Sequence, residues 1–113
     1  MNSNDDYSVD IQHLLIRTMV TDAEVFSRSQ NILKPDYFDD VLRPAVKFVL
    51  DYSAEYSSLP STDLIYANTK INISPVDNVA AHGDWYMKTI EKFCRYRALE
   101  LAVLALSEVS KAA

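Results

Sequence analysis

Apolar residues recur every three or four positions in several stretches of this chain, which is the spacing of an amphipathic helix. A first helix is predicted from about Ser8 to Val20. Its inward side is formed by Ile11, Leu14, Leu15 and Met19. Thr21 and Glu24 have the spacing of a capping box, so a second, shorter helix is expected to begin at Thr21. Val25, Phe26 and Ile32 supply its apolar side.

Prolines and serines divide the rest of the chain. Pro35 ends the second helix and places Phe38 in the core after a short turn. Pro44 is tolerated only in a first helical turn, so a third helix is expected to begin near Leu42 and to bury Val46, Val49 and Tyr56. Ser61 then caps a short helix through Tyr66.

Two more helix starts are predicted in the second half. The order Ser74-Pro75-Val76-Asp77 puts serine at the cap, proline at the first helical position and an acid beyond them. Gly83 separates that piece from a last helix, about Asp84 to Lys111. We therefore expect an all-α fold, a small helical bundle of about five to six helices ending in one long helix. Residues 1–7 are expected to be disordered, and residues 8–113 to form one domain.

Composition supports this fold class. The chain has 113 residues, of which 49% are hydrophobic, and a single glycine. A sheet protein of this size needs several tight turns, and tight turns usually use glycine. The one cysteine cannot form an internal disulfide, and no secretory leader is visible, so a cytoplasmic protein is expected. No apolar run approaches a membrane span of about 20 residues.

The last helix contains a segment that is apolar on all sides. Between Ala98 and Leu106 only Glu100 is polar. Leu99, Val103 and Leu106 share one side of the helix, and Leu101 and Leu104 lie roughly opposite. One interpretation makes this a central helix wrapped by the others, because a helix that is apolar all round is usually buried. In the other, one face packs on this domain and the second face on another chain or a further segment.

Charge and residue spacing argue against most catalytic chemistry. The net charge is −5, with 5 basic and 11 acidic residues in 1–63 and 6 basic and 5 acidic residues in 64–113. A chain with one glycine cannot build a phosphate loop. His13 and His82 have no metal-ligand spacing, and Cys94 has no evident triad. The group Asp36, Asp39 and Asp40 is more simply explained by a helix N-terminus than by metal or acid–base work. No catalytic residue, metal or cofactor is expected in this chain.

One basic concentration stands out on the last helix. Its members, which could contact nucleic-acid phosphates or a partner protein, are Lys88, Lys92, Arg95 and Arg97. Among the aromatic residues nearby, Tyr96 is expected to be exposed, and Trp85, Tyr86 and Phe93 are expected in the core.

Three segments together resemble a known family. They are Leu33-Lys34-Pro35-Asp36-Tyr37-Phe38, Glu55-Tyr56-Ser57-Ser58-Leu59-Pro60-Ser61 and Glu91-Lys92-Phe93-Cys94-Arg95-Tyr96-Arg97-Ala98. Their order is similar to that in the N-terminal domain of DnaB-type replicative DNA helicases, closest to the primase-helicases of T-even-like phages. The resemblance covers roughly residues 8–110. Bacterial members usually carry a glycine-rich stretch where this chain has residues 70–75, which favours the phage version.

The resemblance implies a non-catalytic N-terminal domain that forms the collar of a hexameric ring. Its partners would be other helicase subunits, primase and a helicase loader, with DNA contacted indirectly through the parent in the cytoplasm of an infected bacterium. The parent would unwind DNA 5′ to 3′, and its ATP and Mg would bind a motor domain that is absent here. In the family the long helix is one arm of a hairpin that pairs subunits. In this chain it would be residues 85–109.

The residues expected at a protein interface are therefore Tyr96, Leu99, Val103 and Leu106. Two other functions remain open from the residues alone. One is a free-standing helicase loader or adaptor. The other is a small nucleic-acid-binding regulator that uses the Lys88–Arg97 face.

Overall fold

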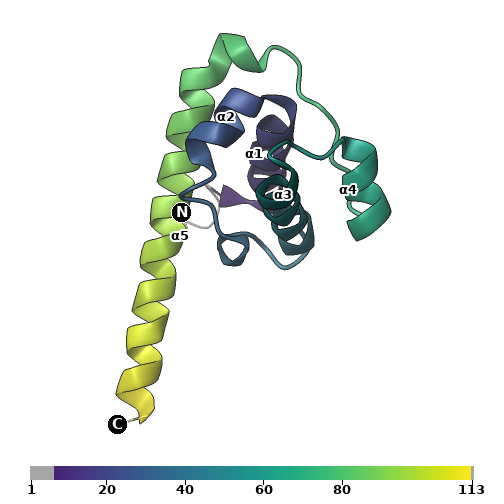
Figure 1. Ribbon diagram of the computed structural model, residues 1–113. Coiled ribbons are helices and arrows are strands. Elements are labelled where there is room, and N and C mark those ends of the chain that lie inside the picture. The colour runs from purple at the N-terminus through teal and green to yellow at the C-terminus, as the bar shows by residue number, and fades with distance from the viewer. Residues whose placement is uncertain (1–6, 113) are drawn as a thin grey trace.

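Every regular element between residues 7 and 112, the part of the chain that the computed structural model describes, is helical. The all-α prediction is confirmed for this part, which ends in one long helix (Figure 1). The elements are α1 (Val9–Thr21), α2 (Ala23–Ser29), the 3-10 helix η2 (Pro35–Tyr37), α3 (Arg43–Tyr56), α4 (Thr62–Thr69), the 3-10 helix η3 (Val79–His82) and α5 (Gly83–Ala112).

The core is formed by apolar side chains of α1, α2, α3, α4 and the first half of α5. Leu15 of α1, Ile65 of α4 and Phe93 of α5 have no exposed surface. Phe38 follows η2 and is also fully buried, as the sequence predicted, with its ring centroid 4.9 Å from that of Phe93. Tyr56 is an error of the prediction. It lies at the end of α3 and is 59% exposed, because the helix has left the core by that point.

Side-chain caps fix where the early helices begin. The Ser8 hydroxyl accepts from the Ile11 amide and caps α1, and the Ser61 hydroxyl accepts from the Leu64 amide and caps α4. The prediction that Thr21 caps α2 is wrong. Asp22 caps it, through an Oδ1 that accepts from the Glu24 and Val25 amides at 2.9 and 3.3 Å. Thr21 is instead the last residue of α1, and its hydroxyl donates to the Arg17 carbonyl.

The helix predicted to begin at Ser74-Pro75 does not form. This segment has no regular structure and lies across α1, and the next helical turn, η3, begins only at Val79. The Arg17 guanidinium donates to the carbonyl oxygens of Ser74 and Pro75, at 2.9 and 3.0 Å. The Val76 amide donates to the Thr21 hydroxyl. These contacts with α1 hold the segment in an extended conformation, so its local capping signal is not used.

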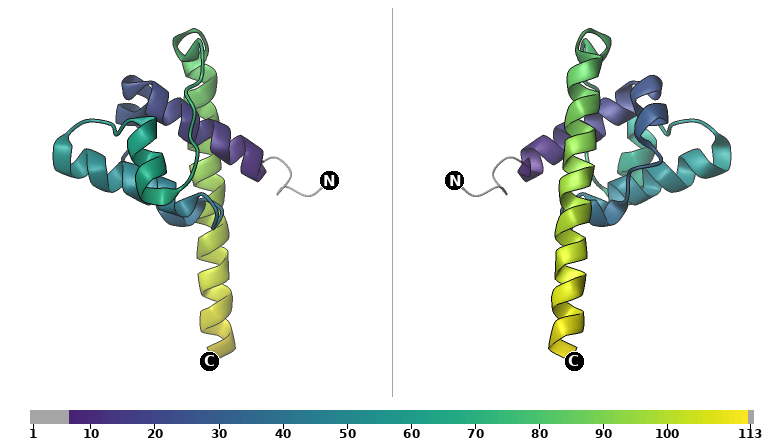
Figure 2. Two further views of the ribbon diagram at one scale, coloured as in Figure 1. Left: turned by 90° about the vertical axis from the view of Figure 1, so that its right-hand side faces the viewer. Right: turned by 90° about the vertical axis from the view of Figure 1, so that its left-hand side faces the viewer.

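The last helix, α5, extends well beyond the part of it that packs in the core. At about 1.5 Å per residue its 30 residues reach about 45 Å, and the longest dimension of the molecule is 47 Å. Both views in Figure 2 show the other helices gathered around the upper part of α5, with its C-terminal part standing clear of them. Gly83 does not interrupt the chain here, because it has helical dihedral angles and begins α5.

Tyr7, which was predicted to be disordered, packs against α5. The Tyr7 ring lies 5.4 Å from the ring of Phe93 and 5.3 Å from that of Tyr96. The Tyr7 carbonyl also accepts a hydrogen bond from the Gln12 amide group. Residues 1–6, also predicted to be disordered, lie outside the described residues.

Candidate protein-interaction surface on the last helix

One side of α5 faces the core, and the opposite side faces solvent from Trp85 to Leu106. The inward residues Tyr86, Ile90 and Phe93 are buried. A helix turns by about 100° per residue, so residues Leu99 and Val103 point roughly opposite to Ile90 and Phe93. No other element of the described chain therefore covers this outward side.

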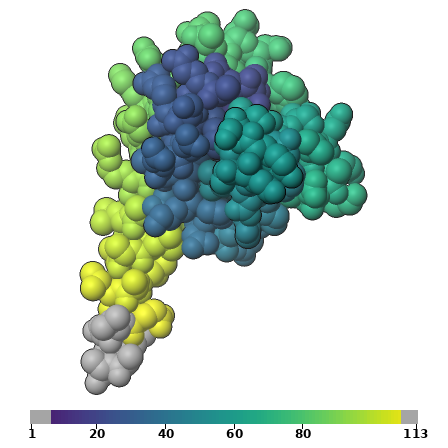
Figure 3. All heavy atoms as spheres, in the orientation of Figure 1, coloured from purple at the N-terminus to yellow at the C-terminus, as the bar shows by residue number. Residues whose placement is uncertain are grey.

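Three of the four predicted interface residues lie on this outward side. Leu99, Val103 and Leu106 are 65%, 56% and 70% exposed. The interpretation of Ala98–Leu106 as a wrapped central helix is therefore wrong. Leu101, on the core-facing side, still packs against the core, whereas Leu104 on that side is exposed because the bundle has ended. In the space-filling view this part of α5 projects from the body (Figure 3).

Tyr96, the fourth predicted interface residue, has a different environment. It is half-buried rather than exposed, which corrects the prediction, and its ring lies on that of Tyr7. Its hydroxyl donates to a Glu100 carboxylate oxygen at 3.3 Å. Tyr96 therefore belongs to the edge of the core, beside the outward leucines but not among them.

The four basic residues of α5 do not form one surface. Lys88, Lys92 and Arg95 are exposed on the outward side, at the same three- and four-residue spacing as the leucines further along. Arg97 points the other way. Its Nε donates to the Tyr37 carbonyl at 2.7 Å, and its guanidinium forms an ion pair with Glu100. Arg97 thus holds η2 against α5, and it is less available to a partner than the other three.

Trp85 is a surface residue that the sequence analysis placed in the core. It is 54% exposed, and it precedes Lys88 on the outward side of α5. The signal that could have found it is the continuous spacing of the outward positions. These run through Trp85, Lys88, Lys92, Arg95, Leu99, Val103 and Leu106, and we call them the outward stripe of α5. The stripe is aromatic and basic over the bundle and apolar beyond it.

Three of the side chains considered for metal or acid–base work, Asp39, Asp40 and His13, make contacts within the chain. Asp39 lies before α3, and its carboxylate accepts from the Val41 amide, while Asp40 pairs with Arg43. His13 contacts the Asn72 carbonyl through Nε2 at 3.0 Å, and His82 is exposed. In the described part of the chain, no three His, Cys, Asp or Glu side chains gather as a metal site would require.

Cys94 is buried in the face of α5 that meets the core. Desolvation by burial raises the pKa of its thiol from 9.0 to about 12. The thiol therefore stays protonated at neutral pH, and a protonated thiol is a poor nucleophile. The prediction that Cys94 packs rather than reacts is supported by this environment.

Among the described residues, no helix is both long enough and apolar enough to cross a lipid bilayer. Comparison of the chain with protein-family models, with curated proteins and with solved structures finds no match.

Proposed function

We propose that this chain is a non-catalytic N-terminal interaction and oligomerisation domain of a hexameric phage replicative DNA helicase, where it forms the ring collar and docks primase or a loader. The observation that carries the proposal is the exposure of Leu99, Val103 and Leu106 on a helix that extends beyond its own bundle. Contiguous apolar surface of this kind usually marks a site of protein association. The order of the three segments that resemble the helicase family supplies the family part of the proposal.

The charge distribution along the outward stripe limits how two copies can pair. If two α5 helices packed in parallel along the whole stripe, Lys88, Lys92 and Arg95 would face the same residues of the other copy. Like charges at such a seam are unfavourable. An antiparallel pair centred between residues 102 and 103 brings Leu99 against Leu106 and leaves the basic positions outside the apolar contact. Pairing through the apolar half alone is therefore the arrangement that the stripe favours.

Sedimentation equilibrium tests this proposal directly. This chain is compared, over a wide concentration range, with a chain extended by about 60 residues of the parent reading frame, enough for a second hairpin arm of about 45 Å and its turn. We expect the extended chain to form dimers or hexamers. If both chains stay monomeric at high concentration, the collar function is rejected.

A free-standing loader or adaptor is the nearest alternative. The two functions predict different genes. A helicase gene must continue into a motor domain with a phosphate loop, whereas the gene of a loader or adaptor need not. Reading the gene downstream of this segment separates the two. A reading frame that stops without such a motif would favour the adaptor.

A small nucleic-acid-binding regulator is the second alternative, and one observation favours it. Trp85, Lys88, Lys92 and Arg95 are all exposed on one side of α5. An exposed ring beside cations can stack on a base while the cations contact phosphates. Binding to a single-stranded oligonucleotide that weakens steeply with salt, and that is lost in Lys88→Ala/Lys92→Ala, would support this function.

A further inference from the structure

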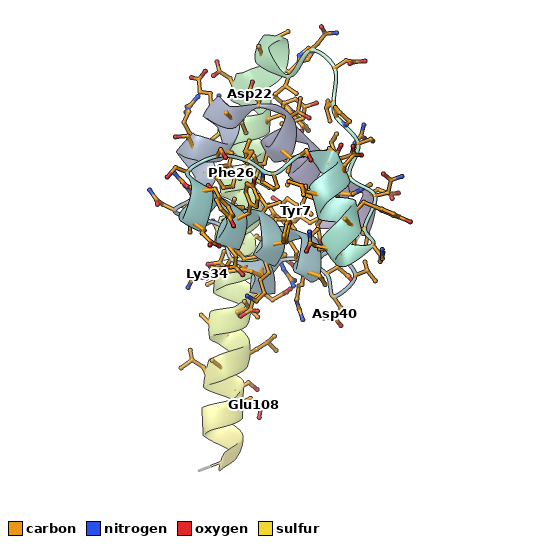
Figure 4. The ribbon with its side chains drawn as sticks, turned by 45° about the vertical axis from the view of Figure 1, so that its right-hand side comes forward. Tyr7, Asp22, Phe26, Lys34, Asp40 and Glu108 are labelled. Carbon is orange, nitrogen blue, oxygen red and sulfur yellow. The ribbon has the colours of Figure 1, made fainter. Side chains whose placement is uncertain are left out.

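A hollow lies between the end of α2 and the middle of α5. Pairing of α5 helices in the proposed collar does not explain the residues that line it. Its volume is ≈ 430 Å³, and it is lined from one side by Arg28, Ile32 and Lys34 and from the other by Glu91, Arg95 and Ala98. In Figure 4, Lys34 lies beside α5 near the level where that helix leaves the bundle, on the far side of the molecule from Asp40.

Three cations of this hollow form no ion pair with the described residues. Arg28, Lys34 and Arg95 are exposed, and no carboxylate of the described residues lies within ion-pair distance of any of them. Three basic residues against the single acid Glu91 give the hollow a positive charge in a chain whose net charge is −5. Three other basic residues of the described chain do form ion pairs, Arg43 with Asp40, Lys47 with Asp51 and Arg97 with Glu100.

Part of the lining of the hollow is apolar. Ala98 is exposed and Ile32 is 40% exposed, while Cys94 and Tyr37 contribute side chains that are buried. Ile32 had been expected to pack on the apolar side of α2. It lies at the edge of the hollow instead, where its side chain offers a contact for an apolar residue of a partner.

We infer that this hollow docks a short acidic segment of a partner protein, in which an apolar side chain is flanked by carboxylates. The apolar side chain would pack on Ile32 and Ala98, and the carboxylates would pair with Arg28, Lys34 and Arg95. This inference rests on the proposed function in one respect, since the primase or loader named there would carry the segment.

A protein segment fits the hollow better than a nucleic acid does. Base recognition by single-strand binders uses exposed aromatic rings. Among the described residues that line the hollow, Tyr37 is the only one with an aromatic ring, and it is buried. Glu91 at the rim would repel a run of phosphates, whereas a peptide can direct a polar residue toward it. The apolar part of the lining also has no counterpart in a phosphate backbone.

The test measures fluorescence anisotropy of a labelled synthetic peptide with two leucines flanked by glutamates. Two comparison probes are the same peptide with every glutamate replaced by glutamine, and an oligothymidylate of similar length. The protein variants are Arg28→Glu/Lys34→Glu in the hollow and Lys88→Glu/Lys92→Glu on the outward stripe, which make the same change in charge. Far-UV circular dichroism checks that both variants keep their helices.

We expect saturable binding of the acidic peptide, weakened about tenfold or more by the hollow variant and less than about threefold by the control variant. The glutamine peptide should bind more weakly than the acidic one. A lysine version of the peptide should bind the hollow variant better than the unaltered chain.

Several results would overturn the inference. They are an absence of saturable binding, equal losses in the two variants, and oligothymidylate binding that is tighter and equally sensitive to Arg28→Glu/Lys34→Glu. Because the peptide is titrated against the chain by itself, failure here leaves the sedimentation result for the collar function unaffected.

Discussion

The Nε of Arg97 donates a 2.7 Å hydrogen bond to the backbone carbonyl of Tyr37, 60 positions earlier in the chain. With its ion pair to Glu100, this contact binds η2 to the middle of α5. We expect Arg97→Ala to lower the free energy of unfolding by about 1.5–3 kcal/mol, the usual value for a hydrogen bond to a charged group. Urea denaturation measures this change.

Lys92→Ala is the matched control for Arg97→Ala. Lys92 lies on the same helix but on the outward stripe, and it is exposed. Its removal should change the free energy of unfolding by no more than about 0.5 kcal/mol. Equal effects of the two substitutions would contradict a structural role for Arg97.

Phe93 and Trp85 provide a second contrast on α5. Phe93 is fully buried against Phe38, and Phe93→Ala should cost about 3–5 kcal/mol of stability through lost packing and the cavity left behind. Trp85→Ala should cost less than about 1 kcal/mol, because its ring is 54% exposed. The fluorescence of this single tryptophan should be quenched readily by iodide in the folded protein. A shielded, blue-shifted emission would contradict the exposed position.

The apolar half of the outward stripe can be tested without unfolding the domain. Leu99→Glu/Leu106→Glu should change the thermal midpoint of this chain very little, because neither side chain contacts the core. In the chain extended by the second arm, the same pair should abolish self-association, as judged by sedimentation. Leu15→Glu serves as the destabilising control, since Leu15 is fully buried in α1. Unfolding of the short chain by Leu99→Glu/Leu106→Glu would mean that this face is core.

Cys94 makes stability depend on alkaline pH. Burial raises the pKa of its thiol from 9.0 to about 12. Below pH 9 the thiol is protonated in both the folded and the unfolded state, so its full contribution to the free energy of unfolding is present. Between about pH 9 and 12 only the unfolded state loses the proton, so the free energy of unfolding falls by up to about 1.4 kcal/mol per pH unit.

Cys94→Ala isolates this contribution from the other groups that titrate at high pH. The unaltered chain should be more stable than the variant at pH 7, because the variant loses buried volume. This difference should shrink as the pH rises from about 9 toward 12, measured by thermal unfolding with a reducing agent present. A constant difference would show that the thiol ionises equally in both states.

Much of the fold follows from signals that are local in the sequence. Ser8, Ser61 and Pro44 lie where caps and first turns need them, so α1, α3 and α4 begin within a residue of their predicted positions. The residues at Ser74 form an equally typical helix-start pattern, yet no helix begins there. The reason is the guanidinium of Arg17, which is 57 positions away and engages the Ser74 carbonyl. A contact at that separation leaves no trace in the local pattern.

The candidate surface was predicted only in part, because local spacing can be read from the sequence and contacts between distant segments cannot. The spacing of Leu99, Val103 and Leu106 identifies a shared face, and the structure leaves that face exposed. Composition alone grouped Arg97 with Lys88, Lys92 and Arg95, although it turns inward. Helical spacing separates them, since Arg97 falls on the side of Phe93 and Leu101. The hollow beside Arg95 was not foreseen, because its cations come from two elements that are far apart in sequence.

The extended segment between α4 and η3 is held by side chains rather than by a backbone ladder. His13 and Arg17 bind its carbonyls, and Thr21 accepts from the Val76 amide. Within the described residues, the amides of residues 72–74 donate to no backbone carbonyl. In native-state hydrogen exchange these amides should therefore exchange much faster than those of α1 beneath them. Arg17 therefore fastens this segment to α1. We expect Arg17→Ala to let the segment detach from α1 while the helices stay folded.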